Sequence, residues 1–333
     1  MSAKPTHCVI SSCASTASFG SSARRTVCFA LLCGLLCVSN VSNALAQTDK
    51  KTKPTIKADI VLNTRDGWAI HIDYFQSGGG RETPVVVLLH GEGGNRQVWR
   101  KGFAERLWKK DYAVITVDLR KHGQSVRLLG GAAAREKVTV SDRQSMVYLD
   151  MEAVKKFILT EHTAQRLNMN KLAIIAPEMS AAVAVNYALL DWSKRPHDDA
   201  GLGRGTQRGR DVRALILLSP EQNPKGLPTG QALRRLQSSA WQIAFYFFYG
   251  DKDQLDKKGE AKRMYNIVSA KKGSQSRMFL KKFTGLKYRG TDLLGKNNPR
   301  TKCEEHMLLF LDDHLKKLTR QRWVDRRSRF NRK

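Results

Sequence analysis

The chain has 333 residues, and 58 lysines and arginines against 30 aspartates and glutamates give it a net charge of +28. A chain of this length can bury a hydrophobic core, which excludes a small domain that depends on disulfides for its stability. The charge favours contact with anionic surfaces such as nucleic acid, acidic polysaccharide or phospholipid. However, the basic residues are spread along the chain with one dense cluster, which also fits a general basic bias.

The first 46 residues have the pattern of a secretory signal peptide. Arg24 and Arg25 precede an apolar run over 27–38, and residues 44–46 offer a small-x-small cleavage site before Gln47. The apolar run is about half of the ~20 residues that a transmembrane helix needs. We therefore expect an exported protein, secreted or periplasmic, with no membrane span once the signal is removed. Cys303 is then the one cysteine of the mature chain, because the other five lie in the removed segment.

The rest of the chain predicts strands that alternate with helices. After a polar linker at 47–54, apolar runs predict strands at 55–63, 68–76, 85–89, 112–117, 172–176, 212–218, 243–249 and 277–283. Helical spacing of apolar residues predicts helices at 97–110, 145–162, 179–192, 229–238, 259–268 and 303–318, and 193–210 is predicted to be a loop. The first two strands should form a hairpin through the turn at 65–67.

This alternation predicts an α/β fold. Right-handed crossovers give a mostly parallel, twisted sheet of about eight strands with helices on both faces. A binding crevice is then expected at the carboxyl ends of the strands. The segment 219–228 is too short for a cap domain. We expect one domain over 55–320, followed by a basic tail at 321–333.

Two segments carry the strongest motifs. The first, 84–125, has an apolar run before His90-Gly91, and it ends in the run from Asp118 to Ser125 with Lys121 inside it. The second, 176–180, has a small residue on each side of Glu178 at the end of a predicted strand. A sharp strand-to-helix turn of this kind raises the central side chain above the edge of a sheet.

The first segment resembles the α/β-hydrolase superfamily, with its pattern LLHG…W…Y-x-V-x-x-x-D-x-R-G-H-G-x-S. Lys121 in place of a glycine is the one departure. With the turn around Glu178, the motif Gly250-Asp-Lys-Asp253 and the closing helix, the resemblance covers roughly 55–320. Because no cap domain is expected, the chain is most similar to members without a cap, such as those like dienelactone hydrolase and serine aminopeptidases. The resemblance implies an α/β-hydrolase fold and a Ser-His-acid triad.

The triad positions of the family hold other residues here. Glu178 stands in the nucleophile position, Arg289 in the histidine position, and Asp253 in the acid position, with Asp251 as the alternative acid. A shifted turn would make Ser180 the nucleophile. His306 is the nearest histidine in the sequence, but it lies within the predicted closing helix, where a surface role is the simpler interpretation.

The family's oxyanion hole maps to backbone N–H groups at Glu92 and Met179. A carboxylate at position 92 is unusual beside such a hole, and we expect it to point to solvent. His90 and His122 correspond to positions that structure loops in the family. We see no Cys/His pattern for a metal and no phosphate-binding glycine loop, so no cofactor is expected.

These replacements suggest an ion-pair cluster, because a neutral serine and a titrating histidine are exchanged for a carboxylate and a guanidinium. We expect Glu178 to pair with Arg289, which would also reach Asp253. The first functional hypothesis is therefore a non-catalytic or strongly altered member that binds a small-molecule or polymeric ligand. The second is an active hydrolase on esters or related acyl substrates, using Glu178 with Asp253 or Ser180 with His306.

The third hypothesis is a protein that binds an anionic polymer or a membrane surface. The segment 316–333 holds nine basic residues and one acid, with Trp323 and Phe330 between them. That composition suits contact with polyanions or phospholipid headgroups. A solvated, frayed tail is the alternative interpretation of the same segment.

Overall fold

The computed structural model describes residues 53–332 except 101, 129, 132–136, 202–203, 272 and 274. The predicted signal peptide and most of the predicted linker lie outside the described residues. Within the described ranges, no helix combines the length and the apolar character needed to cross a membrane.

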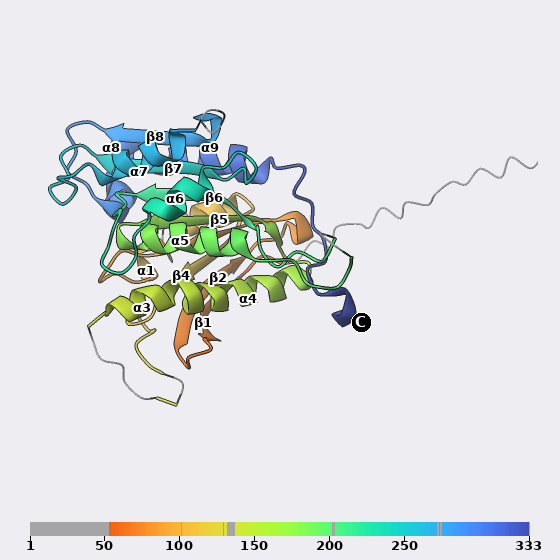
Figure 1. Cartoon of the computed structure of the whole chain (residues 1–333). Helices are drawn as coiled ribbons and strands as arrows, with labels where there is room; N and C mark the ends of the chain where they lie inside the picture. Colours follow the sequence, from red (N-terminus) through yellow and green to blue (C-terminus); the bar gives the residue numbers. More distant parts are fainter. Residues whose placement is uncertain are drawn as a thin grey trace, which may run out of the picture. The chain divides into compact units, whose positions relative to one another are not determined.

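A single eight-stranded sheet forms the centre of the described chain (Figure 1). Its strands are β1 (Thr55–Asn63), β2 (Ala69–Gln76), β3 (Pro84–Leu88), β4 (Ala113–Val117), β5 (Asn168–Pro177), β6 (Val212–Leu218), β7 (Ala244–Gly250) and β8 (Met278–Phe283). They lie in the order β1-β2-β4-β3-β5-β6-β7-β8. β1 and β2 are antiparallel to their neighbours and the other pairs are parallel. The predicted α/β fold with about eight, mostly parallel strands is confirmed.

Helices cover both faces because successive residues of a strand point to opposite sides of the sheet. In β3, Val85 and Val87 pack into one core, and Val86 and Leu88 pack into the other. The first core takes side chains from α4 (Met151–Thr163), α5 (Met179–Ser193), α6 (Gly230–Leu236) and α7 (Glu260–Ser269). The second takes them from α1 (Gln97–Arg100), α2 (Phe103–Lys109) and α9 (Cys303–Leu311). The short α8 spans Asn298–Thr301.

Three predicted helices differ from the observed ones. The expected helix at 97–110 is two helices, because Gly102 has an extended backbone between α1 and α2. The expected start at Ser145 is wrong, because α3 (Val140–Ser145) begins earlier. There Thr139 and Asp142 form a reciprocal capping box, which fixes a helix start. A π-helical turn, Met146–Asp150, then joins α3 to α4. The closing helix α9 ends at Leu311 and continues as a second π-helical turn.

The C-terminal segment after α9 packs on the domain. The indole N–H of Trp323 donates to the carbonyl of His162 at 2.9 Å, and the two rings stack with centroids 5.1 Å apart. Arg326 is buried and bonds to Asp211. Arg327 pairs with Asp325 at 2.8 Å. Of the two interpretations of the tail, the frayed one is therefore wrong over residues 319–332, which form a docked segment.

Candidate functional site

A strained turn places Glu178 above the carboxyl edge of the sheet. Glu178 lies between the end of β5 and the start of α5, with φ 51° and ψ −124°. This region of backbone conformation costs a non-glycine residue of order 1–3 kcal/mol. The turn is held from two sides, because the Glu178 N–H donates to Leu218 at 2.9 Å and its carbonyl accepts from Glu221 at 3.1 Å. The sequence motif at 176–180 thus folds into the sharp turn that it predicts.

Ser180 is the second residue of α5 and is fully buried. Its hydroxyl donates to the backbone carbonyl of His90. A buried hydroxyl in such a bond ties α5 to the loop after β3 and does not face a ligand. Glu178, not Ser180, is the residue that the turn presents.

Arg289 lies in the middle of a group of carboxylates. Its Nη1 donates to Asp253 at 2.9 Å and its Nη2 donates to Glu221 at 2.8 Å. Its Nε lies 3.9 Å from Oε1 of Glu178, which is an ion pair without a hydrogen bond. We call Glu178, Glu221, Asp253 and Arg289 the edge cluster.

The sequence predicted three of these four residues. The expected pairing of Glu178 with Arg289 is present but loose, and the tight bonds of Arg289 go to Asp253 and Glu221 instead. Glu221 was missed because it belongs to no motif. Its position three residues after the end of β6 is the available signal, since side chains that follow parallel strands gather at one edge.

Two glycines make room for the Glu178 carboxylate. A Cβ atom added at Gly91 would lie 2.6 Å from Oε2, and one added at Gly290 would overlap Oε1. Gly290 also has φ +50°, and its N–H donates to the Ser219 hydroxyl at 3.0 Å. The carboxylate therefore fills the space between the loop after β3 and the loop that carries Arg289.

Burial and unequal charge shift the pKa values in the edge cluster. Burial raises the pKa of Glu178 above its ordinary value, the Arg289 charge opposes this, and Glu221, Asp292 and Asp253 add to the increase. For Arg289, burial acts to lower the pKa, but the bond to Asp253 and the charges of Asp253, Glu178 and Glu221 outweigh it and raise the pKa. Arg289 is thus a permanent cation, whereas Glu178 takes up a proton more readily than an exposed glutamate does.

The histidines are used elsewhere. The Nδ1 of His90 donates to the Gly91 carbonyl at 2.7 Å, and its Nε2 accepts from the Leu119 N–H at 3.1 Å. Burial lowers the His90 pKa to about 4, so this histidine is a neutral loop support. The His122 Nδ1 lies 2.9 Å from the Arg120 carbonyl. Both observations agree with the loop-structuring roles expected for His90 and His122.

His306 lies on α9, with its ring 6.5 Å from the Tyr246 ring. Its nearby charges are Lys281 and Glu305, so its surroundings are β7, β8 and its own helix. In the described part of the chain, no hydrogen bond or ion pair joins a histidine to the Glu178 side chain.

The two positions assigned to an oxyanion hole have different surroundings. Glu92 has a 44% exposed side chain and pairs with Arg143, so it points outward and away from the turn. Met179 is fully buried as the first residue of α5. Its backbone belongs to the first turn of a helix, where N–H groups lack intrahelical acceptors. Across the described residues, no three His, Cys, Asp or Glu side chains converge as a metal site would require.

Known proteins are similar to this chain in part of its sequence and in its fold. The sequence model of the family described as alpha/beta hydrolase fold matches residues 84–236. An esterase of Pyrococcus furiosus superposes with a TM-score of 0.55 at 15% identity, covering 79% of this chain and 92% of that one. Residues 84–236 therefore match the α/β-hydrolase family in sequence, and the described chain has the α/β-hydrolase fold.

Two further solved structures share this α/β-hydrolase fold. A thermostable carboxyl esterase from Bacillus coagulans has a TM-score of 0.55 at 12% identity, over 79% of this chain and 100% of that one. An esterase from the archaeon Pyrobaculum calidifontis has a TM-score of 0.52 at 16% identity, over 81% and 87%. Sequence comparison with curated proteins finds no match. At these identities the likeness establishes the fold of this chain and not its activity.

Proposed function

We propose that this protein is a non-catalytic or strongly altered member of the superfamily that binds a ligand at the carboxyl edge of its sheet. The observation that carries the proposal is the position of Arg289, which stands where the family has its histidine and bonds to both Asp253 and Glu221. A guanidinium that two carboxylates hold, with a raised pKa, cannot accept a proton from a nucleophile.

The remaining candidate groups do not supply the missing chemistry. Acyl transfer needs a nucleophile with a base within hydrogen-bond reach. The Ser180 hydroxyl already donates to the backbone carbonyl of His90, and among the described residues the cation that pairs with the Glu178 carboxylate is Arg289. A carboxylate nucleophile would still require a base that activates water in the second step. The carboxylates of Asp253 and Glu221, which are the groups of the edge cluster that could act as this base, are both bonded to Arg289.

The unequal charge of the edge cluster indicates what kind of ligand would bind there. Three carboxylates share one guanidinium, which leaves an excess of negative charge at this edge although the whole chain is strongly basic. A ligand that carries a cationic group, or donates several hydrogen bonds, would compensate Glu178 and Glu221. Their side chains are 25% and 34% exposed, so both remain within reach.

An active hydrolase is the second candidate, and two observations favour it. The Pyrococcus furiosus and Bacillus coagulans structures with the same fold are esterases, and burial raises the pKa of Glu178, as burial does for carboxyls that act as general acids. Hydrolysis of short-chain p-nitrophenyl esters by the protein and by Glu178→Ala separates the candidates. We expect no hydrolysis above the blank from either. Activity that disappears in Glu178→Ala would overturn the proposal and make Glu178 catalytic.

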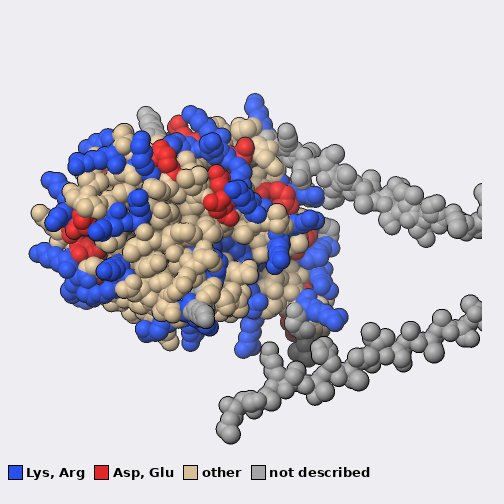
Figure 2. Space-filling view, turned by 90° about the horizontal axis from the view of Figure 1, so that it is seen from above, with Lys and Arg blue, Asp and Glu red and all other residues tan. Residues whose placement is uncertain are grey.

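Binding of an anionic polymer or membrane receives less support from the tail than its composition suggested. Arg326 and Arg327 of the tail are occupied by Asp211 and Asp325. Figure 2 shows lysines and arginines distributed over the face in view, with acidic residues between them. The hypothesis is therefore reduced to a general electrostatic attraction between the basic protein surface and an anionic polymer or membrane.

We also propose that the protein is exported. The support is the sequence pattern of residues 1–46, with its apolar run and its cleavage site before Gln47. Mass spectrometry of the protein recovered from the producing cell tests the proposal. A mature chain that begins at Gln47 is expected, and a chain that retains Met1 or begins at Ser2 would contradict it.

A further inference from the structure

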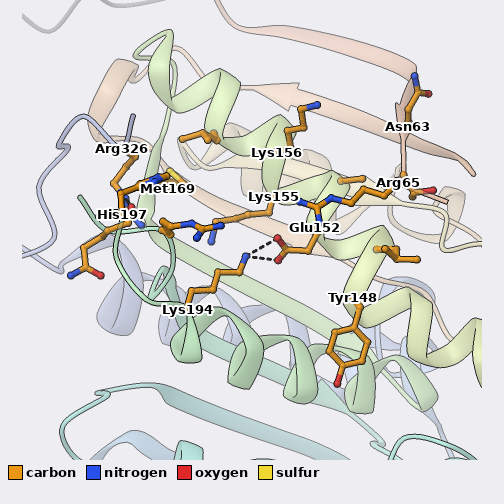
Figure 3. Close-up of a pocket in the computed structure, with 16 residues that line it drawn as sticks. Asn63, Arg65, Tyr148, Glu152, Lys155, Lys156, Met169, Lys194, His197 and Arg326 are labelled. Carbon is orange, nitrogen blue, oxygen red and sulfur yellow. Dashed lines mark hydrogen bonds and ion pairs between the residues drawn. The ribbon is translucent and has the colours of Figure 1, made fainter. Parts of the chain in front are cut away.

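A second site lies away from the edge cluster. A cavity of about 450 Å³ opens beside α4, between the turn after β1 and the segment that joins α5 to β6 (Figure 3). Its volume is within the range of small-molecule sites. Met169, near the start of β5, lines it, whereas Glu178 follows the other end of the same strand. No residue of the edge cluster lines this cavity.

Buried ion pairs build the inner wall of the cavity. Lys155 of α4 bonds to Asp191 and, at 2.6 Å, to Asp211. Arg326 from the C-terminal segment bonds to the other oxygen of Asp211. We call these four residues the floor cluster. Its two cations are balanced by its two acids, and the side chains are at most 7% exposed.

The only acidic residue that lines the cavity is also neutralised. Glu152 accepts from Lys194 with both carboxylate oxygens, at 2.5 and 2.7 Å. Figure 3 shows this pair between the helix and the connecting segment, with the Arg65 side chain extending toward it. No lining carboxylate therefore remains for another cation.

Three basic residues that line the cavity form no ion pair with any described residue. Arg65, Lys156 and Arg208 are exposed, and among the described residues none of them forms an ion pair. They come from the turn after β1, from α4 and from the segment before β6. Cations from three separate elements thus surround one cavity whose acids are already used.

The cavity also has an apolar side. Leu149, Ala153, Leu159 and Met169 line it, and Tyr148 stands at its rim with 58% of its surface exposed. An inorganic anion would contact the basic side chains but not the apolar side of the cavity. An organic anion would use both, since aromatic and aliphatic groups gain from contact with apolar walls.

We propose that this cavity is a binding site for a small organic phosphate with an apolar or aromatic body. Arginine forks match phosphate oxygens in two-point contacts, and Arg65 and Arg208 supply two such forks. The site is independent of the edge cluster, so a ligand could occupy it whether or not the crevice is catalytic.

Phenyl phosphate is the probe, and isothermal titration calorimetry at low salt is the measurement. We expect the protein to bind phenyl phosphate more tightly than inorganic phosphate, because the ring contacts the apolar wall. Arg65→Ser combined with Arg208→Ser should weaken binding at least tenfold. Tyr148→Ala should weaken the binding of phenyl phosphate and leave that of inorganic phosphate unchanged.

Arg263→Ser combined with Arg300→Ser is the matched control. Both arginines are exposed and lie outside the cavity, and their loss changes the net charge by the same amount as the loss of Arg65 and Arg208. The control should bind phenyl phosphate as the unaltered protein does. An equal loss in both double variants would reduce the effect to general charge and overturn the proposal. Absence of phenyl phosphate binding, or inorganic phosphate binding as tightly, would also overturn it.

Discussion

Both the edge cluster and the floor cluster consist of carboxylates and basic side chains, but only the floor cluster has equal numbers of the two. In the floor cluster, Lys155 and Arg326 face Asp191 and Asp211, so the buried charges cancel. In the edge cluster, Arg289 alone faces three carboxylates, two of which are partly exposed. A buried charge needs an opposite charge beside it to keep its ionised form, whereas an unpaired carboxylate near solvent can exchange protons or bind a ligand.

The pKa shifts follow this difference. Burial acts to raise the pKa of Asp191, but Lys155 and the backbone N–H groups of Asp211 and Val212 outweigh it, and the pKa is lowered. For Glu178 burial prevails over the distant Arg289, and the pKa is raised. The first carboxyl is held as an ion and the second is pushed towards its neutral form. The floor cluster therefore has the character of a structural group, and we propose ligand binding at the edge cluster.

Loss of a floor cation should have the largest effect on stability. Lys155→Met leaves Asp191 and Asp211, both fully buried, with one cation between them. Breaking a buried pair in this way costs about 3–5 kcal/mol of the free energy of unfolding. Urea denaturation followed by circular dichroism measures it. Lys317→Met, at an exposed pair with Asp313, is the control and should leave that free energy unchanged.

Loss of the edge cation should cost less. Arg289→Met leaves Asp253, whose side chain is 3% exposed, without its partner, but Glu221 can turn to water. An unsatisfied buried polar group costs about 1–3 kcal/mol. The same denaturation experiment should rank this variant below Lys155→Met in damage. The opposite ranking would show that the edge cluster is the main structural one.

Removal of the Glu178 charge should stabilise the protein, and the effect should depend on pH. A carboxyl whose pKa is raised on folding contributes its stability below its ordinary pKa near 4.5 and loses it as the pH rises. Glu178→Gln should therefore match the unaltered protein near pH 4 and melt at a higher temperature at pH 7. Thermal unfolding at both pH values measures this. A variant that melts lower at pH 7 would mean that the pair with Arg289 stabilises the fold.

The sequence was sufficient for the sheet but not for all of the site. The apolar run at 212–218 coincides with β6, because a strand buried in a sheet leaves a clear pattern, and the predicted strand at 55–63 coincides with β1, an exposed strand at the edge of the sheet. The break at Gly102 and the cap at Thr139 depend on local backbone geometry that apolar spacing does not reveal. The signal peptide lies outside the described residues and stays a prediction.

Site residues were predictable where a motif carried them. The turn around Glu178 and the motif that ends at Asp253 gave two members of the edge cluster, and the resemblance of the segment after the last predicted strand gave Arg289. The floor cluster was not predictable, because its members come from α4, α5, the start of β6 and the C-terminal segment. Charges that are distant in sequence meet only through the fold. The same contacts explain why a segment with the composition of a tail is docked.

The most direct measurement is p-nitrophenyl acetate hydrolysis by the protein beside a variant that combines Glu178→Ser with Arg289→His. By the proposed correspondence, the double variant places a serine in the family's nucleophile position and an imidazole in its histidine position, with Asp253 as the proposed acid. We predict no hydrolysis by the unaltered protein and measurable hydrolysis by the double variant, increasing through the pH range in which an imidazole loses its proton. Hydrolysis by the unaltered protein that is lost in the double variant would contradict the claim that the edge cluster replaces a catalytic triad.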